Sequence, residues 1–105
     1  MPRLHYLKRA KSNLAQIHIY ISITSGSADA GRDLVAHIQR KCSRLAALLG
    51  HIGRARPELS PEARSFAYGN YIIFFRYSGK VFEVINILEG HLDFDARATE
   101  WHDED

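Results

Sequence analysis

The chain contains a single cysteine, Cys42, so it cannot form an intrachain disulfide. This cysteine falls at an apolar position of a helical pattern, where a buried and unreactive thiol is expected. Long apolar runs are also missing, because the most apolar segment, YIIFF, is far too short to cross a bilayer. The N-terminal segment MPRLHYLKRAKS is basic, but no apolar stretch follows it, so no signal peptide is predicted. We therefore expect a cytoplasmic protein that does not contact the membrane.

The common sequence motifs of enzymes are absent as well. There is no glycine-rich phosphate loop and no GxSxG, CxxC or HExxH motif. The six histidines are scattered without the spacing of metal ligands. His91, Asp93, Asp95 and His102 lie close in sequence, but a solvated C-terminal tail explains them better than a metal site. We predict no catalytic residue, no metal and no cofactor.

The length and composition indicate one globular domain over residues 1–105. Hydrophobic residues make up 46% and charged residues 25% of the chain, as in ordinary soluble proteins. The net charge is +2, but up to Pro57 there are ten basic and two acidic residues, and from Glu58 onward four basic and ten acidic. Residues 91–105 form an acidic tail. Either a basic face meets nucleic acid or an acidic partner, or the two halves offset each other in the fold.

Two amphipathic helices are predicted in the first half, because apolar residues recur there at spacings of three and four. Gly26 can end the first helix, and Ser27 can cap the second, with Asp29 in its first turn. Gly50 can end the second helix. The apolar positions are Ala10, Leu14, Ile17 and Ile21 in the first helix and Leu34, Val35, Ile38, Cys42, Leu45 and Leu49 in the second.

Strands are predicted on both sides of these helices. A short strand covers Arg3 to Leu7, and another covers Arg64 to Tyr68 before a Gly69-Asn70 turn. The segment YIIFFRYSGKVFEVINIL has the composition of a β-hairpin with Ser78-Gly79 as its turn. The order predicts an α+β fold: a short N-terminal strand, a two-helix hairpin, then a three-stranded antiparallel meander with the helices packed on one sheet face.

The predicted turn divides the hairpin residues between two faces of the sheet. The face expected to pack on the helices carries Tyr71, Ile73, Phe75, Tyr77, Lys80, Phe82, Val84 and Asn86. The opposite face carries Ile72, Phe74, Arg76, Val81, Glu83, Ile85 and Ile87. This second face is too apolar for a free sheet surface, so either the chain itself covers it or it binds a partner.

One kind of catalysis would need none of the missing motifs. Metal-independent RNA cleavage uses cations to stabilise the phosphate and a His, Glu or Tyr to move protons. The candidates for such a site are Arg64, Arg76, Lys80, Glu89 and His91. The competing explanation is structural: Arg76 pairs with Glu83 across the hairpin, and Lys80 keeps the turn soluble.

Three segments together, GRARPEL, RSFAYGNYIIFFRY and FEVINILEG, resemble the ParE-type toxins of the ParE/RelE superfamily. Upstream, NLAQIHIYI and SADAGRDLVAHIQRKCSRLAALLGHI are similar to the two-helix segment of that family. The resemblance runs from about Leu4 to Gly90. The residues that carry the family signature are Gly53, Arg54, Arg56, Pro57, Glu58, Leu59, Arg64, Tyr71 and Arg76.

The resemblance implies the toxin component of a type II toxin–antitoxin system. ParE-type toxins inhibit DNA gyrase without acting as enzymes, whereas RelE-type relatives cleave messenger RNA on the ribosome. In many superfamily members the last strand reads Arg-Val/Ile-Leu-His, but here it reads Asn86-Ile87-Leu88-Glu89. Asn86 brings no positive charge to a phosphate and Glu89 would repel one, which favours a gyrase inhibitor. A ribonuclease and a non-toxic homologue that only binds antitoxin are the alternatives.

The resemblance also implies a ParD-like antitoxin in a hetero-oligomer, with DNA contacted only indirectly through the antitoxin. An antitoxin segment with acidic and apolar residues would suit a surface formed by Arg40, Lys41, Arg44, Ile72, Phe74, Arg76 and Ile85. The GRARPEL segment has two possible roles. Arg54 and Arg56 either pair with Glu58 and Glu62 and fix how the helices meet the sheet, or they contact a partner.

Overall fold

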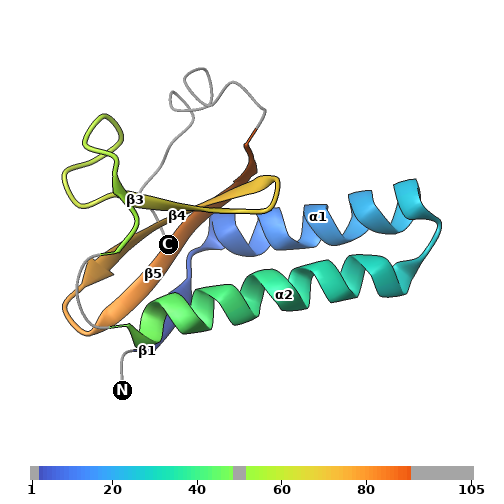
Figure 1. Ribbon diagram of the computed structural model, residues 1–105, viewed down its shortest axis with the longest axis horizontal. Helices are drawn as coiled ribbons and strands as arrows, with labels where there is room; N and C mark the ends of the chain where they lie inside the picture. The colour runs from blue at the N-terminus through green and yellow to red at the C-terminus, as the bar shows by residue number, and fades with distance from the viewer. Residues whose placement is uncertain (1–2, 49–51, 91–105) are drawn as a thin grey trace.

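The computed structural model describes residues 3–48 and 52–90 of the chain. The first half holds one strand and two helices, and the second half holds four strands (Figure 1). In chain order the elements are β1 (Arg3–Tyr6), α1 (Lys8–Ser25), α2 (Ala28–Ala47), β2 (Arg54–Ala55), β3 (Arg64–Tyr68), β4 (Tyr71–Ser78) and β5 (Val81–Glu89).

The two helices form an antiparallel hairpin whose turn agrees with the sequence prediction. Gly26 ends α1 in the left-handed conformation, with φ 72°, where glycine is favoured. The Ser27 hydroxyl caps α2 by accepting a hydrogen bond of 3.2 Å from the amide of Ala30. α2 ends at Ala47, and the predicted end at Gly50 lies outside the described residues. The far end of this hairpin extends beyond the strands (Figure 1).

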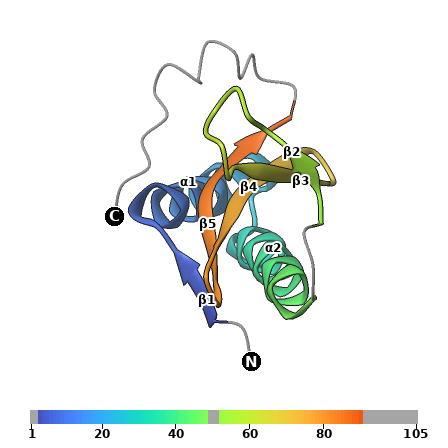
Figure 2. The ribbon, with the colours of Figure 1, turned by 90° about the vertical axis from the view of Figure 1, so that its left-hand side faces the viewer.

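The strands form one sheet in the order β1-β5-β4-β3-β2. β1 runs parallel to β5, and the other neighbours are antiparallel. β1 and β2 lie at opposite edges of the sheet (Figure 2). The α+β class and the meander are confirmed, and β2 is an additional two-residue strand that the sequence did not predict.

The core lies between the helix hairpin and one face of the sheet. The apolar stripes of the helices supply one side, and alternate residues of β4 and β5 supply the other, as the side-chain periods of helix and strand require. The buried cluster consists of Ala10, Leu14, Ile17, Ile38, Cys42, Leu45, Ala46, Tyr71, Ile73, Phe75, Phe82, Val84 and Ile87.

The predicted turn of the β4–β5 hairpin is wrong, and the pairing of the two strands is shifted by two residues from the predicted register. Ser78 lies opposite Val81, so Gly79 and Lys80 form the turn. Gly79 has φ 61° and takes the first central position, which type II′ hairpin turns reserve for glycine. A shift by two leaves the strand residues on their predicted faces, so the helix-facing placement of Phe75, Tyr77, Phe82 and Val84 is correct. Lys80, also expected to face the helices, is exposed in the turn.

Further from the turn, a β-bulge in β5 places the side chains of this strand on the sheet face opposite to the predicted one. Phe75 lies opposite Val84 but Phe74 lies opposite Asn86, so Ile85 is the extra residue. Beyond the bulge, Ile87 packs in the core under the helices, although it was expected on the other face. Asn86, expected toward the helices, lies opposite Phe74 on the other side of the sheet. Both placements correct the prediction.

The second sheet face is only partly exposed. Phe74 and Ile85 are 1% and 0% exposed, so at these positions the chain itself covers the sheet. Ile72 is half-buried. Of the two alternatives for this face, coverage by the chain itself therefore holds for its two most central residues, and neither is exposed to an antitoxin in this structure. Within the described residues, neither helix is long and apolar enough to span a membrane.

Candidate functional site

The signature arginine Arg64 fastens the chain segment that leads from α2 into the sheet. Its Nε donates a hydrogen bond of 2.7 Å to the carbonyl of Ile52, and a terminal nitrogen donates one of 2.9 Å to the carbonyl of Gly53. The planar guanidinium thus holds two consecutive carbonyls at once. Arg64 therefore has a structural role in this protein.

Arg56 is fixed in a similar way, and Arg54 is not. The Nε of Arg56 donates a hydrogen bond of 2.8 Å to the hydroxyl of Ser65, and its guanidinium lies 3.5 Å from the carboxylate of Glu58. The Arg56 side chain is 11% exposed, whereas Arg54 lies at the exposed edge of the sheet. The structural role predicted for this segment therefore holds for Arg56 with Glu58. No described residue forms an ion pair with Arg54 or Glu62.

Arg76 pairs with Glu83 across the β4–β5 hairpin, as the structural explanation predicted. The Nε of Arg76 lies 2.5 Å from Oε1 of Glu83, and the two side chains are 19% and 17% exposed. Because both charges are largely removed from water, this pair is more important for folding than an exposed ion pair.

The ribonuclease candidates do not form one site. Arg64 lies opposite Phe75, so its side chain projects from the helix-facing side of the sheet and that of Arg76 from the other. Lys80 is in the hairpin turn, and Glu89 is at the far end of β5. His91 lies outside the described residues.

The basic residues predicted to bind the antitoxin gather beside β3. A pocket of about 120 Å³ opens between α2 and β3, and we call it the basic pocket. Lys41 Nζ lies 4.5 Å from the ring centroid of Phe66, close enough for a cation–π contact. The pocket is lined by His37, Arg40, Lys41, Arg44 and Tyr68.

These cations are separated from the rest of the predicted antitoxin surface. Phe66 lies opposite Ile73, so β3 presents the basic pocket on the helix-facing side of the sheet. Phe74 and Arg76 project from the opposite side. The structure therefore brings the three cations Arg40, Lys41 and Arg44 together, but divides them from Ile72, Phe74, Arg76 and Ile85. Binding of an antitoxin by either group remains a prediction.

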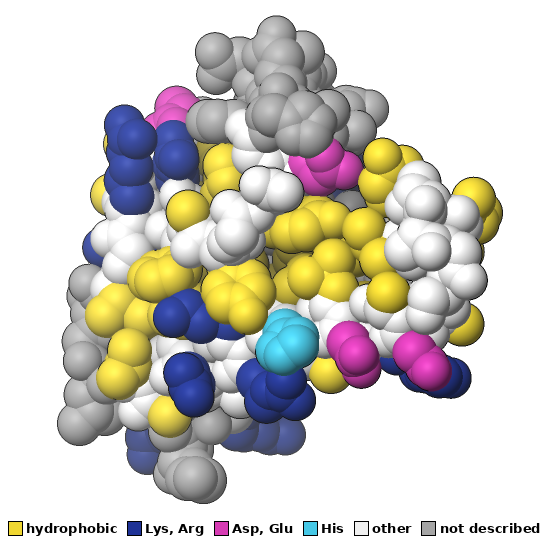
Figure 3. Space-filling view, turned by 45° about the vertical axis from the view of Figure 1, so that its right-hand side comes forward, with side chains coloured by type: hydrophobic (Ala, Val, Ile, Leu, Met, Phe, Trp, Pro, Cys, Tyr) yellow, Lys and Arg dark blue, Asp and Glu magenta, His cyan; other side chains and the backbone are white. Residues whose placement is uncertain are grey.

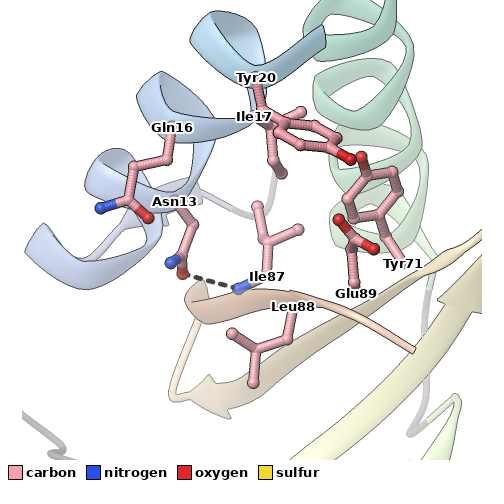
Figure 4. Close-up of a pocket in the computed structure, with 8 residues that line it drawn as sticks. All are labelled: Asn13, Gln16, Ile17, Tyr20, Tyr71, Ile87, Leu88 and Glu89. Carbon is pink, nitrogen blue, oxygen red and sulfur yellow. Dashed lines mark hydrogen bonds between the residues drawn. The ribbon is translucent and has the colours of Figure 1, made fainter. Parts of the chain in front are cut away.

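A second pocket, of about 180 Å³, lies between α1 and the last residues of β5, and we call it the α1–β5 pocket. Tyr20 of α1 and Tyr71 of β4 point toward one another at one end, with the carboxylate of Glu89 beside Tyr71 (Figure 4). Burial and, secondarily, the negative charge of Glu89 raise the pKa of Tyr71. The lining residues are Asn13, Gln16, Ile17, Tyr20, Tyr71, Ile87, Leu88 and Glu89.

Apolar side chains continue from this pocket along the exposed part of α1. Ile19 and Tyr20 are each 56% exposed, and Ile23 is 75% exposed. Hydrophobic side chains gather over the middle of this face of the molecule, and Lys and Arg side chains gather below them (Figure 3). An exposed apolar area bordered by charge is typical of a protein-binding surface.

Several residues of these two pockets were not identified from the sequence. His37 lies three residues before Arg40 on α2, so helical spacing contained a signal for it. Tyr68, Asn13 and Gln16 carried no such signal, because only the packing of α1 and α2 on the sheet brings them to the pockets. Among the described residues, no group of three or more His, Cys, Asp or Glu side chains is placed to hold a metal ion.

Comparison with known proteins identifies the family. The family model of the ParE toxin of the type II toxin–antitoxin system parDE matches residues 4–94. Among solved structures, the chain is similar to one from the chromosomal ParDE toxin–antitoxin system of P. aeruginosa, with a TM-score of 0.70 and 21% sequence identity. That alignment covers 85% of this chain and 96% of the other. At this identity the likeness concerns the fold. No curated protein matches significantly.

Proposed function

Since the chain belongs to the family of ParE toxins of parDE type II toxin–antitoxin systems, we propose that it inhibits DNA gyrase and is neutralised by a ParD-like antitoxin. The match over residues 4–94 carries this proposal, because it includes both helices and all of the described sheet except Arg3. The protein acts by binding and not as an enzyme. The proposal requires a cytoplasmic protein, because gyrase acts on the chromosome.

The dispersal of the ribonuclease candidates supports this choice of target. A ribosome-dependent nuclease would need cations and a proton-transfer group around one phosphate. Here Arg64 holds backbone carbonyls and Arg76 pairs with Glu83. Asn86 and Glu89 stand where many superfamily members carry Arg and His, so the last strand brings no cation to such a site.

The antitoxin is proposed to bind the exposed apolar part of α1 and the neighbouring α1–β5 pocket in a hetero-oligomer. Ile19, Tyr20 and Ile23 supply apolar area there, and an amphipathic segment could cover it. Acidic side chains of the same segment are proposed to reach the cations of α2, Arg40, Lys41 and Arg44, which line the basic pocket beside β3. A bound antitoxin then prevents other partners from binding the exposed apolar part of α1 and the cations of α2.

The experiment is induced expression of the chain with and without its antitoxin, followed by plasmid supercoiling and by a supercoiling assay with purified gyrase. We expect growth arrest with DNA damage, loss of negative supercoiling, and inhibition of purified gyrase that the antitoxin reverses. Cleaved transcripts with normal supercoiling would instead identify a ribonuclease of RelE type. Growth without arrest, combined with stable antitoxin binding, would identify a non-toxic homologue.

A further inference from the structure

The basic pocket collects four titratable or cationic side chains on one face of α2. His37, Arg40, Lys41 and Arg44 follow the spacing i, i+3, i+4, i+7, which aligns them over roughly 10 Å of helix. No described residue forms a salt bridge with any of the three cations. Asp33, one turn before His37, does not line the pocket. The positive charge of this face is therefore available to an anion from outside.

The geometry of the pocket keeps these charges in place. The ring of Phe66 lies under the ammonium of Lys41, at 4.5 Å, and holds it at the pocket wall. Tyr68, which projects from β3 on the same face as Phe66, lines the pocket together with the α2 side chains. The hollow between α2 and Tyr68, about 120 Å³, lets an anionic group sit among the cations instead of above a flat surface.

The chemistry of the lining discriminates between two kinds of anion. Three of the five lining side chains, Arg40, Lys41 and Arg44, donate hydrogen bonds and accept none, whereas the Tyr68 hydroxyl and a neutral His37 ring can also accept one. A phosphodiester backbone brings acceptors only, so it matches this lining. A peptide also brings one N–H group per residue, and the helix offers it no free backbone acceptor, since the carbonyls within α2 are engaged along the helix. A polyanion without donors is the better match.

We propose that the basic pocket binds the backbone phosphates of duplex DNA. This inference rests on the proposed inhibition of gyrase. The free toxin then contacts both gyrase and the DNA that gyrase holds. The contact would be direct, in addition to the indirect contact expected through the antitoxin. An antitoxin segment that places acidic side chains on α2 would compete with DNA for Arg40, Lys41 and Arg44.

The test is fluorescence anisotropy of a short labelled DNA duplex, titrated with the purified chain between about 50 and 200 mM salt, without gyrase or antitoxin. The double variant Arg40→Gln/Arg44→Gln is compared with Arg3→Gln/Lys11→Gln, which removes the same charge from two exposed positions outside the pocket. We expect the first pair to weaken binding by about tenfold or more and to lower the salt dependence by about two phosphate contacts. The second pair should leave both the affinity for DNA and its salt dependence close to those of the wild type. Thermal unfolding verifies that both variants are folded.

Two results would overturn the proposal. One is equal weakening by both double variants, which would mean binding by overall charge. The other is tighter binding of a polyglutamate peptide than of DNA at the same salt, which would assign the pocket to an acidic polypeptide. Gyrase inhibition is measured separately: a chain that binds DNA through the pocket but leaves gyrase active contradicts the proposed function and supports this inference. Gyrase inhibition without DNA binding contradicts this inference and supports the proposed function.

Discussion

The side-chain oxygen of Asn13 in α1 accepts a hydrogen bond of 2.9 Å from the backbone amide of Ile87 in β5 (Figure 4). β1 pairs with β5 only as far as the Tyr6–Val84 pair, so beyond it this edge of β5 lies beside α1 and not beside a strand. The Asn13 amide therefore substitutes for a neighbouring strand at this position. It also holds together the two elements that form most of the α1–β5 pocket.

Replacing Asn13 by Ala should destabilise the protein by about 1–3 kcal/mol, because the Ile87 amide then loses its acceptor in a partly buried position. The control Asn13→Asp keeps an acceptor of the same length and should lose clearly less. Urea unfolding measures the change in the free energy of unfolding. Hydrogen exchange of the Ile87 amide gives a local readout, and unchanged exchange in the Ala variant would contradict the assigned hydrogen bond.

Much of the fold followed from the sequence, because its signals are local. The apolar stripe of α1, the Gly26 C-cap and the Ser27 N-cap are each encoded within a few residues. The β-bulge in β5 was missed for a different reason. In VFEVINIL both the odd-numbered and the even-numbered positions are mostly apolar. The hydrophobic pattern therefore contained nothing that revealed a bulge at Ile85.

The candidate site could be predicted only in part, because it depends on contacts between residues that are far apart in the sequence. The predicted antitoxin surface included Arg40, Lys41 and Arg44, and these three residues do line one pocket. The sequence did not show that Tyr68 of β3 lines the basic pocket or that Phe66 contacts Lys41, since both depend on how α2 packs on the sheet. Family resemblance singled out the arginines of GRARPEL, but only the hydrogen bonds show that Arg56 serves the fold.

Gly53 should be more sensitive to substitution than the turn glycine Gly69, although both have positive φ, 80° and 58°. A Cβ at Gly53 would lie 2.5 Å from the carbonyl oxygen of Ser65 and 3.0 Å from the ring of Phe75, whereas one at Gly69 meets nothing within 4 Å. Gly69→Ala should therefore cost only the conformational strain of about 1–2 kcal/mol. Gly53→Ala adds a backbone clash, and we expect at least about 1 kcal/mol more. Chemical denaturation of the two variants compares them directly, and equal losses would show that the Ser65 contact relaxes freely.

Cys42 should be unreactive in the folded protein. It is fully buried, and burial raises the pKa of its thiol from 9.0 to about 11. Thiol reagents at pH 8 should modify it only after unfolding. A rapid reaction in native buffer would contradict the buried assignment.

The same shift makes stability depend on alkaline pH. Between pH 9 and 11 the thiol ionises in the unfolded chain but not in the folded one, so the free energy of unfolding falls as pH rises, by about 2–3 kcal/mol at most. Burial also raises the pKa of Tyr6, which adds to the decrease above pH 10. In Cys42→Ala the decrease over this range should be smaller. An identical pH profile in that variant would assign the effect to other groups.

Arg76 is the residue for which the sequence offered the most roles: signature residue, ribonuclease candidate and antitoxin contact. Its 2.5 Å contact with Glu83 supports a structural role, and because both side chains are mostly buried, removing one leaves the other charge without its partner. Arg76→Met and Glu83→Met should each destabilise the protein by about 2–4 kcal/mol, and the double variant by less than the sum. A double-mutant cycle by urea unfolding measures this coupling. Toxicity of the double variant separates the roles: if Arg76 serves only the fold, growth arrest follows the amount of folded protein, whereas a stable double variant without toxicity would show that Arg76 also contacts the target.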